Sequence, residues 1–347
     1  MAQLDQRWRP KRRHSLFWRD GGQLRISRRG SRHTGSGAGP GHDFCSVDGE
    51  PGGTGDVTGQ QEAPISPSPV WFVTGAASGF GREIVRQVLA SGGRVAATAR
   101  DIGKLQEFAG PNALLLPLDV TDAAAVADAV GQAERHFGGI DRLVTAAGYG
   151  LIAAVEEATE AELRQLFETH FFGTLSAIRA VLPDMRRRRS GHILTFSSVA
   201  GFTGSAGTAL YAAAKFAVEG LSEGLAKEVA PLGIRVTIVE PGPFQTDFFT
   251  TSRRMGERTI LDYDATAGAY RLRAGKPDPW LPGDPARGAA AIRAVTEMEA
   301  PPLRLLLGRF AHDMALATYA ARHAEAEKHA NLAIGADRLD AEGREWP

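Results

Sequence analysis

Short apolar runs alternate with stretches of helical periodicity along residues 69–310. The apolar runs predict strands at 70–74, 94–99, 113–117, 141–145, 191–196, 234–240 and 303–307. Between them, apolar positions that recur at helical spacing predict helices near 80–91, 122–137, 160–187, 208–230 and 284–298. Strands that alternate with helices are typical of β-α-β units, whose right-handed crossovers build a parallel sheet.

The predicted fold is therefore α/β, with a doubly wound, Rossmann-like parallel sheet in a single domain at residues 69–347. The strands are nearly continuous apolar runs rather than alternating ones, which indicates a sheet covered on both faces. One α/β domain can take ~250 residues, so the length of 347 residues does not require a second core.

Residues 1–68 differ from the rest in composition. Ten basic and two acidic residues lie in 1–40, five acidic and no basic residues lie in 41–68, and the whole segment holds 12 glycines. It shows no sustained apolar period, so we predict a disordered Arg/Gly-rich tail. Three interpretations of the tail remain open. It is a solvated extension, which includes a start codon assigned too far upstream; or an organelle targeting segment; or an arm that binds anionic surfaces or nucleic acid.

Charge and cysteine content exclude several classes of protein. The net charge is zero, which argues against a nucleic-acid or anionic-membrane binder. The single cysteine, Cys45, cannot form an internal disulfide or a cysteine metal cluster, and the histidines show no ligand spacing, so no metal is predicted. No run of 18 apolar residues and no secretory h-region occur, so we expect no membrane span and a cytoplasmic protein.

Candidate chemistry begins where the first predicted strand meets the first helix. The turn Thr74-Gly75-Ala76-Ala77-Ser78-Gly79-Phe80-Gly81 places three glycines at a helix N-terminus. Glycines allow the backbone to approach a pyrophosphate, and the free N–H groups of the helix attract phosphate charge. We expect Gly75, Ser78, Gly79, Phe80 and Gly81 to bind a dinucleotide.

The end of the second predicted strand bears on cofactor choice. NAD-specific folds place an acid there for the ribose 2′-hydroxyl, whereas this chain has Ala99 followed by Arg100. An arginine can hold a 2′-phosphate, so Arg100 favours NADP, with NAD possible. A surface arginine without this role is the alternative.

Tyr211 and Lys215 stand four residues apart in a predicted helix and so share one face. A phenol can protonate a forming alkoxide, and a nearby ammonium lowers the phenol pKa. Ser198, at the end of a predicted strand, can hydrogen-bond the same carbonyl oxygen. Each motif also occurs by chance, and only their combination is specific.

Together these residues resemble the shorter, non-extended branch of the short-chain dehydrogenase/reductase family over about 69–310. The resemblance rests on Thr74–Gly81, Leu118-Asp119-Val120, Ser197-Ser198, the Tyr211/Lys215 pair and the run from Glu240 to Thr246. It implies strand order 3-2-1-4-5-6-7, NAD(P)-linked alcohol or carbonyl chemistry, and a homodimer or homotetramer. It also implies that Asp119 and Val120 contact adenine, that Lys215 also binds the nicotinamide ribose, and that the nicotinamide amide is held by Pro241, Gly242, Phe244 and Thr246.

Two positions depart from the family's pattern. Thr145-Ala146-Ala147-Gly148 replaces the usual Asn-Asn-Ala-Gly, although Ala146 and Gly148 still allow close cofactor approach. His170 stands where the family places an asparagine that supports a water relay to the lysine. Its inward-facing position suits either a core residue or a relay member, and in a relay its protonation would matter between pH 5 and 8.

The predicted function is an NADPH-preferring oxidoreductase that transfers a hydride between the cofactor and a carbonyl or alcohol. Tyr211 is the acid or base, Lys215 and Ser198 assist it, and His170 is a candidate relay residue. Residues 244–270 are expected to form a mobile substrate lid, whose apolar side chains suggest a small apolar substrate. The alternative is a dinucleotide-binding regulatory or scaffold protein with weak or no turnover, which the substituted asparagines favour.

Overall fold

The computed structural model describes residues 68–274 and 281–338. Of the predicted disordered tail at 1–68, all but Ser68 lies outside the described residues, as does Cys45. The described residues belong to one compact unit, Pro64–Pro347.

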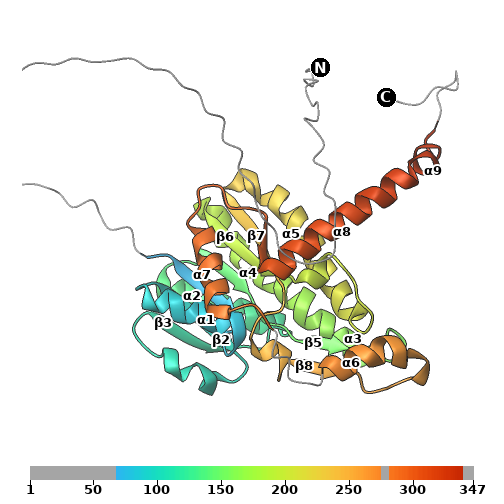
Figure 1. Cartoon of the computed structure of the whole chain (residues 1–347). Helices are drawn as coiled ribbons and strands as arrows, with labels where there is room; N and C mark the ends of the chain where they lie inside the picture. Colours follow the sequence, from blue (N-terminus) through green and yellow to red (C-terminus); the bar gives the residue numbers. More distant parts are fainter. Residues whose placement is uncertain (1–67, 275–280, 339–347) are drawn as a thin grey trace, which may run out of the picture. The chain divides into compact units, whose positions relative to one another are not determined.

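Seven parallel strands form the main sheet, in the spatial order β3-β2-β1-β4-β6-β7-β9 (Figure 1). Their bounds are β1 Val70–Thr74, β2 Arg94–Ala99, β3 Ala113–Pro117, β4 Arg142–Thr145, β6 Gly191–Phe196, β7 Ile234–Pro241 and β9 Arg304–Leu307. Counted along the main sheet alone, this is the order 3-2-1-4-5-6-7, so the predicted fold and strand order are confirmed.

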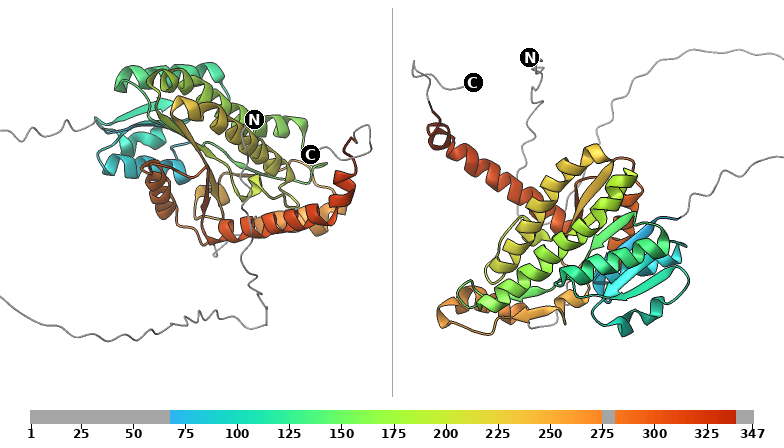
Figure 2. Two further views of the ribbon diagram at one scale, coloured as in Figure 1. Left: turned by 90° about the horizontal axis from the view of Figure 1, so that it is seen from above. Right: turned by 180° about the vertical axis from the view of Figure 1, so that it is seen from behind.

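Helices cover both faces of the sheet (Figures 1 and 2). One face packs against α1 (Gly79–Ala90) and α7 (Pro285–Thr296), through Ile84, Val88 and Ile292. The other face packs against α2 (Ala123–Phe137), α4 (Gly173–Arg188) and α5 (Ala209–Val229). Burial of both faces explains why the strands are apolar throughout, as the sequence indicated.

Local capping fixes where several helices begin. The Asp122 carboxylate accepts hydrogen bonds from Ala124 and Ala125 N–H at the start of α2. Thr159 and Glu162 form a capping box at the start of α3 (Glu160–Phe167). These caps satisfy N–H groups that have no partner inside the helix, which places each start within a residue or two of its predicted position.

The long helix predicted at 160–187 is interrupted. A π-helical turn, η2 (Glu168–Phe172), separates α3 from α4, so the prediction of one continuous helix is wrong. The wider turn still keeps His170 buried, with 2% of its surface exposed. Such π-turns occur often at functional sites.

Two features carry no sequence prediction. β5 (Gly150–Ile152) pairs in parallel with β8 (Arg253–Met255), which makes a separate two-stranded sheet. The helix α8 (Arg309–Lys328) extends away from the main sheet (Figure 1) and buries only Ala311 and Ala315. The remaining elements are short: the helices α6 (Ala269–Ala274) and α9 (Ala330–Ile334), the 3-10 segment η1 (Ile102–Phe108) and helical turns at 199–201, 230–232, 247–249 and 261–268. None of the helices in 68–274 and 281–338 combines the length and hydrophobicity needed to cross a membrane.

Candidate active site

A cavity of about 570 Å³ lies beyond the carboxyl ends of β1, β4, β6 and β7, where open α/β sheets bind ligands. Nearly all of the predicted site residues line it. They are Gly75, Ser78, Gly79, Phe80, Arg100, Asp119, Val120, Ala146, Gly148, His170, Ser198, Tyr211, Lys215, Pro241, Gly242, Phe244 and Thr246. Gly81 is the exception, since it packs behind the turn rather than in the cavity wall.

Two positions of the first turn require glycine, because neighbouring backbone atoms leave no room for a side chain. Gly75 has φ +69°, and a Cβ there would lie 2.7 Å from Ala147 Cα. A Cβ on Gly81 would lie 2.3 Å from the carbonyl oxygen of Gly75. The turn therefore brings bare backbone to the cavity wall at the N-terminus of α1, which is the cradle that a pyrophosphate needs.

Arg100 and Asp119 lie at the same end of the cavity, after β2 and β3. The Asp119 carboxylate accepts hydrogen bonds from Thr121 N–H and Oγ1, and these bonds, together with the charge of Arg100, hold its pKa below the usual value. Asp119 is thus tied into its own loop while Arg100 is exposed. This arrangement fits a nucleotide whose ribose carries an anionic group.

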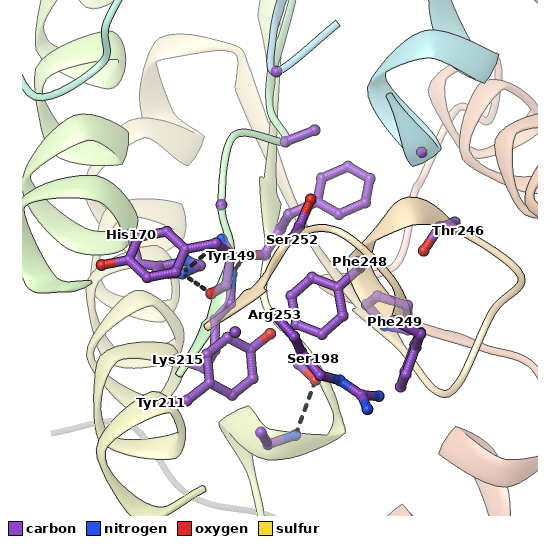
Figure 3. A pocket seen from close by; sticks show the side chains of 18 of the residues that line it. Tyr149, His170, Ser198, Tyr211, Lys215, Thr246, Phe248, Phe249, Ser252 and Arg253 are labelled. Atoms are coloured by element: carbon purple, nitrogen blue, oxygen red, sulfur yellow. Dashed lines mark hydrogen bonds between the residues drawn. The ribbon is translucent and has the colours of Figure 1, made fainter. Parts of the chain in front are cut away.

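Tyr211 and Lys215 lie on one face of α5, and both are buried, with 8% and 5% of their surfaces exposed. The Lys215 ammonium lies 5.8 Å from the Tyr211 ring centroid and donates a hydrogen bond to the Phe196 carbonyl at 2.8 Å. Ser198 follows β6 and faces the Tyr211 hydroxyl (Figure 3). The Ser198 hydroxyl also accepts a hydrogen bond from Ala200 N–H at 3.2 Å, which fixes its position.

Burial dominates the electrostatics of this pair. It raises the pKa of Tyr211 above the usual value, although the Ser198 hydroxyl opposes the rise. Burial also lowers the pKa of Lys215 to about 7, although the negative charge of Glu219 opposes this lowering. In the protein alone, burial thus outweighs the lowering of the Tyr211 pKa that the sequence led us to expect. A protonated phenol is the form that donates a proton to a reduced carbonyl.

His170 packs edge-on against Tyr211, with ring centroids 5.5 Å apart, and contacts Tyr149 (Figure 3). Its Nε2 lies 2.6 Å from the Tyr149 carbonyl oxygen and 3.2 Å from the Tyr149 backbone nitrogen. We assign the proton to Nε2 from the shorter contact, so that Nε2 donates to the carbonyl and Nδ1 is an acceptor. Nδ1 has no hydrogen-bond partner among the described residues. Gly148 makes room for the ring, because a Cβ there would lie 2.5 Å from His170 Cε1.

In a relay, the protonation of His170 was expected to matter between pH 5 and 8, and the surroundings of the ring oppose that protonation. Complete burial and the charge of Lys215 lower the pKa of His170 well below its usual value. The imidazole is therefore neutral at neutral pH, and it can only accept or donate a hydrogen bond without changing charge.

The other end of the cavity is built partly from the predicted lid, which supplies Ser252, Arg253, Arg254 and Tyr270, and partly from segments that the sequence did not single out. Its wall includes Tyr149, Gln165, Thr169, Ser252, Arg253, Arg254, Tyr270, Phe310 and Met314. The Arg253 guanidinium stacks on Phe249 at 4.4 Å and donates to the Ala274 carbonyl. The strands β5 and β8 have three residues each, and α8 is only weakly amphipathic. None of them therefore gave a periodic pattern in the sequence that could have identified these positions.

The predicted lid, 244–270, contributes to the cavity only in part. Phe248 and Phe249 line it, whereas Leu261 is 85% exposed and Tyr263 bonds Glu156 on the surface. Of the apolar side chains that suggested an apolar substrate, Phe248 and Phe249 therefore face the cavity, and Leu261 and Tyr263 do not.

One buried carboxylate holds this segment against the core. Glu157 has 0% of its surface exposed, and it accepts hydrogen bonds from Ala154 N–H at 2.8 Å, Ile260 N–H at 2.9 Å and the Arg271 guanidinium. Burial opposes its ionisation, but these donors outweigh burial and hold its pKa below the usual 4.5.

No group of three or more His, Cys, Asp or Glu in the described ranges is placed to hold a metal ion. The cavity instead combines a glycine cradle with a Ser, a Tyr and a Lys. That combination defines the class as a dinucleotide-binding oxidoreductase.

Comparison with known proteins gives the family. The family described as short chain dehydrogenase matches residues 69–257. "3-ketodihydrosphingosine reductase" of Bacteroides thetaiotaomicron is 37% identical over 242 residues, 68% of this chain and 87% of the relative. A solved short-chain dehydrogenase from Streptomyces avermitilis is 41% identical with a TM-score of 0.73, covering 78% of this chain and 98% of the other. A short chain dehydrogenase from Burkholderia cenocepacia, solved with NADP, is 26% identical with a TM-score of 0.61, covering 76% and 97%.

The chain belongs to the short-chain dehydrogenase/reductase family, whose members are oxidoreductases acting on CH–OH and C=O groups. Two solved relatives, the protein from Burkholderia cenocepacia and a serine dehydrogenase that is 28% identical, hold NADP, which supports a nicotinamide cofactor here.

Proposed function

We propose that this protein is an NADPH-preferring carbonyl reductase, in which Tyr211 supplies the proton, Ser198 orients the carbonyl and Lys215 binds the nicotinamide ribose. The observation that carries the proposal is the meeting of Ser198, Tyr211 and Lys215 in the same cavity as the glycine turn. The nicotinamide cofactor supplies the hydride, and the protein's own groups bind, orient and protonate.

In this proposal each side chain has one task. Tyr211 keeps its proton because burial raises its pKa, and it donates that proton to the carbonyl oxygen during reduction. Ser198 donates a hydrogen bond to the same oxygen. Lys215 is held in place by the Phe196 carbonyl and presents its remaining N–H groups to the cavity. In the oxidative direction Tyr211 acts as the base.

His170 takes a positioning role. Its Nδ1 is a buried acceptor without a protein partner among the described residues, and His170 lines the cavity beside Tyr211. A water bound there can link His170 toward Lys215, as the family's asparagine does by resemblance. The neutral ring serves by hydrogen bonding and not by titration.

The NADPH preference rests on Arg100. No acidic side chain follows β2 directly, and the exposed guanidinium can pair with a 2′-phosphate. Arg100→Ala tests this part.

The substrate is proposed to be a small apolar ketone or aldehyde. The support is the apolar wall of the substrate end, formed by Leu151, Ile152, Phe248, Phe249, Phe310 and Met314. The relative named for 3-ketodihydrosphingosine makes that ketone a sensible member of the test panel.

The deciding experiment follows NADPH oxidation with a panel of ketones, aldehydes and quinones, beside Tyr211→Phe. The proposal expects turnover by the native chain and a loss of ~10²–10⁴-fold in kcat for the variant, with NADPH binding retained. Tight NADPH binding without turnover of any substrate would instead indicate a dinucleotide-binding regulatory protein.

Three further proposals concern organisation. By family resemblance the protein is a homodimer or homotetramer, which light scattering of the purified protein tests. We propose residues 69–347 as the folded unit and a cytoplasmic location. Fractionation of cells expressing the full chain tests the location and checks whether residues 1–68 act as a targeting segment.

A further inference from the structure

Two buried carboxyl groups lie one helical turn beyond Lys215 and take no part in the proposed function. Glu219 follows Lys215 by four residues on α5, and Glu240 lies on the neighbouring strand β7. Their surfaces are 7% and 0% exposed. None of their four carboxyl oxygens makes a hydrogen bond of good geometry with a described residue, although Arg304 lies within ion-pair distance of both.

One cation and one hydroxyl lie next to the pair. Arg304 Nη2 lies 3.4 Å from Glu219 Oε2, and Arg304 Nε lies 3.5 Å from Glu240 Oε1. A Cβ on Gly201 would lie 2.1 Å from Ser197 Oγ and 3.0 Å from Glu219 Oε1, so both atoms crowd the same point. Ser197 also lines the cavity, which makes the pair part of the wall behind the site.

Two carboxylates in one buried site cannot both keep a negative charge at neutral pH, because each disfavours ionisation of the other. Burial and the charge of Glu219 raise the pKa of Glu240 to about 8. Burial also raises the pKa of Glu219, but Ser197, Glu240 and Arg304 oppose the rise. Of the two, Glu240 is the more deeply buried and Arg304 lies slightly nearer to Glu219, so we place the proton on Glu240 and the negative charge on Glu219, one helical turn from Lys215.

The neighbouring titratable and charged groups are few. Tyr211 and Glu223 lie on α5 and His170 on η2, with Arg304 on β9. From α8, Tyr319 and Arg322 act on the same cluster. Glu223 is occupied by Arg304 and Lys227, at 3.0 and 3.3 Å. Glu219 is the carboxylate whose charge opposes the loss of the Lys215 proton.

We propose that Glu219 and Glu240 form a carboxyl pair that shares one proton and keeps Lys215 in its ammonium form up to neutral pH. Both are positioning residues, which act through Lys215 and touch neither substrate nor cofactor. The inference rests on the proposed role of Lys215.

The test measures NADPH affinity by fluorescence between pH 5.5 and 9.5, together with the pH profile of kcat/KM. Loss of the Lys215 proton with rising pH weakens ribose binding and sets an alkaline limit in both profiles. Glu219→Gln removes the negative charge that stabilises the Lys215 ammonium. We therefore expect the alkaline limit to fall by about one to three pH units. Glu240→Gln imitates the protonated carboxyl, and we expect its limit within about half a unit of the native one.

Glu228→Gln is the matched control, because it makes the same substitution on an exposed position of the same helix. Its profiles are expected to coincide with the native ones. A folded Glu219→Gln with an unchanged limit overturns the proposal. Equal shifts in Glu219→Gln and Glu240→Gln overturn the assignment of the proton to Glu240.

Glu219→Leu keeps the test decisive if Glu219→Gln does not fold. It removes the same negative charge without leaving a buried amide unpaired, so the alkaline limit must fall in the same direction, and an unmoved limit overturns the proposal. Lys215→Met separates this inference from the proposed function. If the alkaline limit in NADPH binding persists in Lys215→Met, the role given to Lys215 is wrong. If it vanishes there but does not move in Glu219→Gln, only the carboxyl pair is wrong.

Discussion

The two ends of the cavity are built in different ways. The nucleotide end is backbone and small side chains on long central strands, with Gly75 pressed against Ala147 and with Arg100 and Asp119 at strand ends. The substrate end is made by a three-residue strand pair, a segment tied down by Glu157, and the first turns of α8. The first end depends on backbone geometry that tolerates little change, and the second on a few side-chain contacts between segments far apart in sequence.

The largest expected effect on ligand binding comes from breaking the substrate end alone. Glu157→Ala removes the buried acceptor for Ala154 N–H, Ile260 N–H and the partly exposed Arg271 guanidinium, which we expect to cost about 2–3 kcal/mol. KM for the carbonyl substrate should rise at least ~10-fold while NADPH affinity stays within ~2-fold. Glu156→Ala, an exposed neighbour, is the control, and equal effects on both ligands would contradict the division into two ends.

The same carboxylate makes the substrate end sensitive to acid. Its pKa is lower in the folded protein than the usual 4.5, so its contribution to stability is complete above that value and is lost as pH falls through the lower folded pKa. Proteolysis of the 250–274 segment should therefore increase below pH 4.5 in the native chain. Glu157→Gln should show no such pH step.

The next effect breaks the nucleotide end. Gly75→Ala forces an L residue into φ +69° and drives a Cβ against Ala147, which we expect to cost about 2–5 kcal/mol in the free energy of unfolding. NADPH affinity should fall with it. The matched control is Gly220→Ala, in the exposed part of α5 with no atom within 4 Å of the added Cβ. That variant should be stabilised by up to ~1 kcal/mol.

His170 lies where the two ends meet, and its variants sharpen the comparison. His170→Leu removes the Nδ1 acceptor, so kcat should fall ~10- to 100-fold, while NADPH affinity changes little. His170→Asn should retain most activity. Because the ring is neutral, the pH dependence of kcat in the native protein should show no transition from His170. An unchanged kcat in folded His170→Leu would show that His170 has no role in the reaction.

A smaller effect is expected at Arg100, which is exposed. Arg100→Ala should weaken NADPH binding ~10-fold, toward the lower end for a charge-assisted pair, and leave NADH binding unchanged. Lys104→Ala, on the following exposed turn, controls for loss of a positive charge. Equal losses for NADPH and NADH would contradict a contact with the 2′-phosphate.

The smallest effect is expected from the tail. A chain that starts at Ser66 should keep the melting temperature and kcat/KM of the full chain, because β1 begins at Val70. A loss of stability on truncation would show that residues 1–65 dock on the domain.

The sequence alone determined the sheet and, through the family resemblance, its strand order and the proposed nucleotide end. Continuous apolar runs, a Gly-rich turn after the first of them and a Tyr and a Lys four residues apart are local patterns that the periods of strand and helix translate directly into position. Tertiary structure alone decided the rest. The strands β5 and β8 are too short for a period to show, and α8 has almost no buried face. The lowered pKa values of Glu157 and His170 and the raised pKa of Glu240 follow from burial and from neighbours that the fold supplies, since desolvation has no signature in a residue's type.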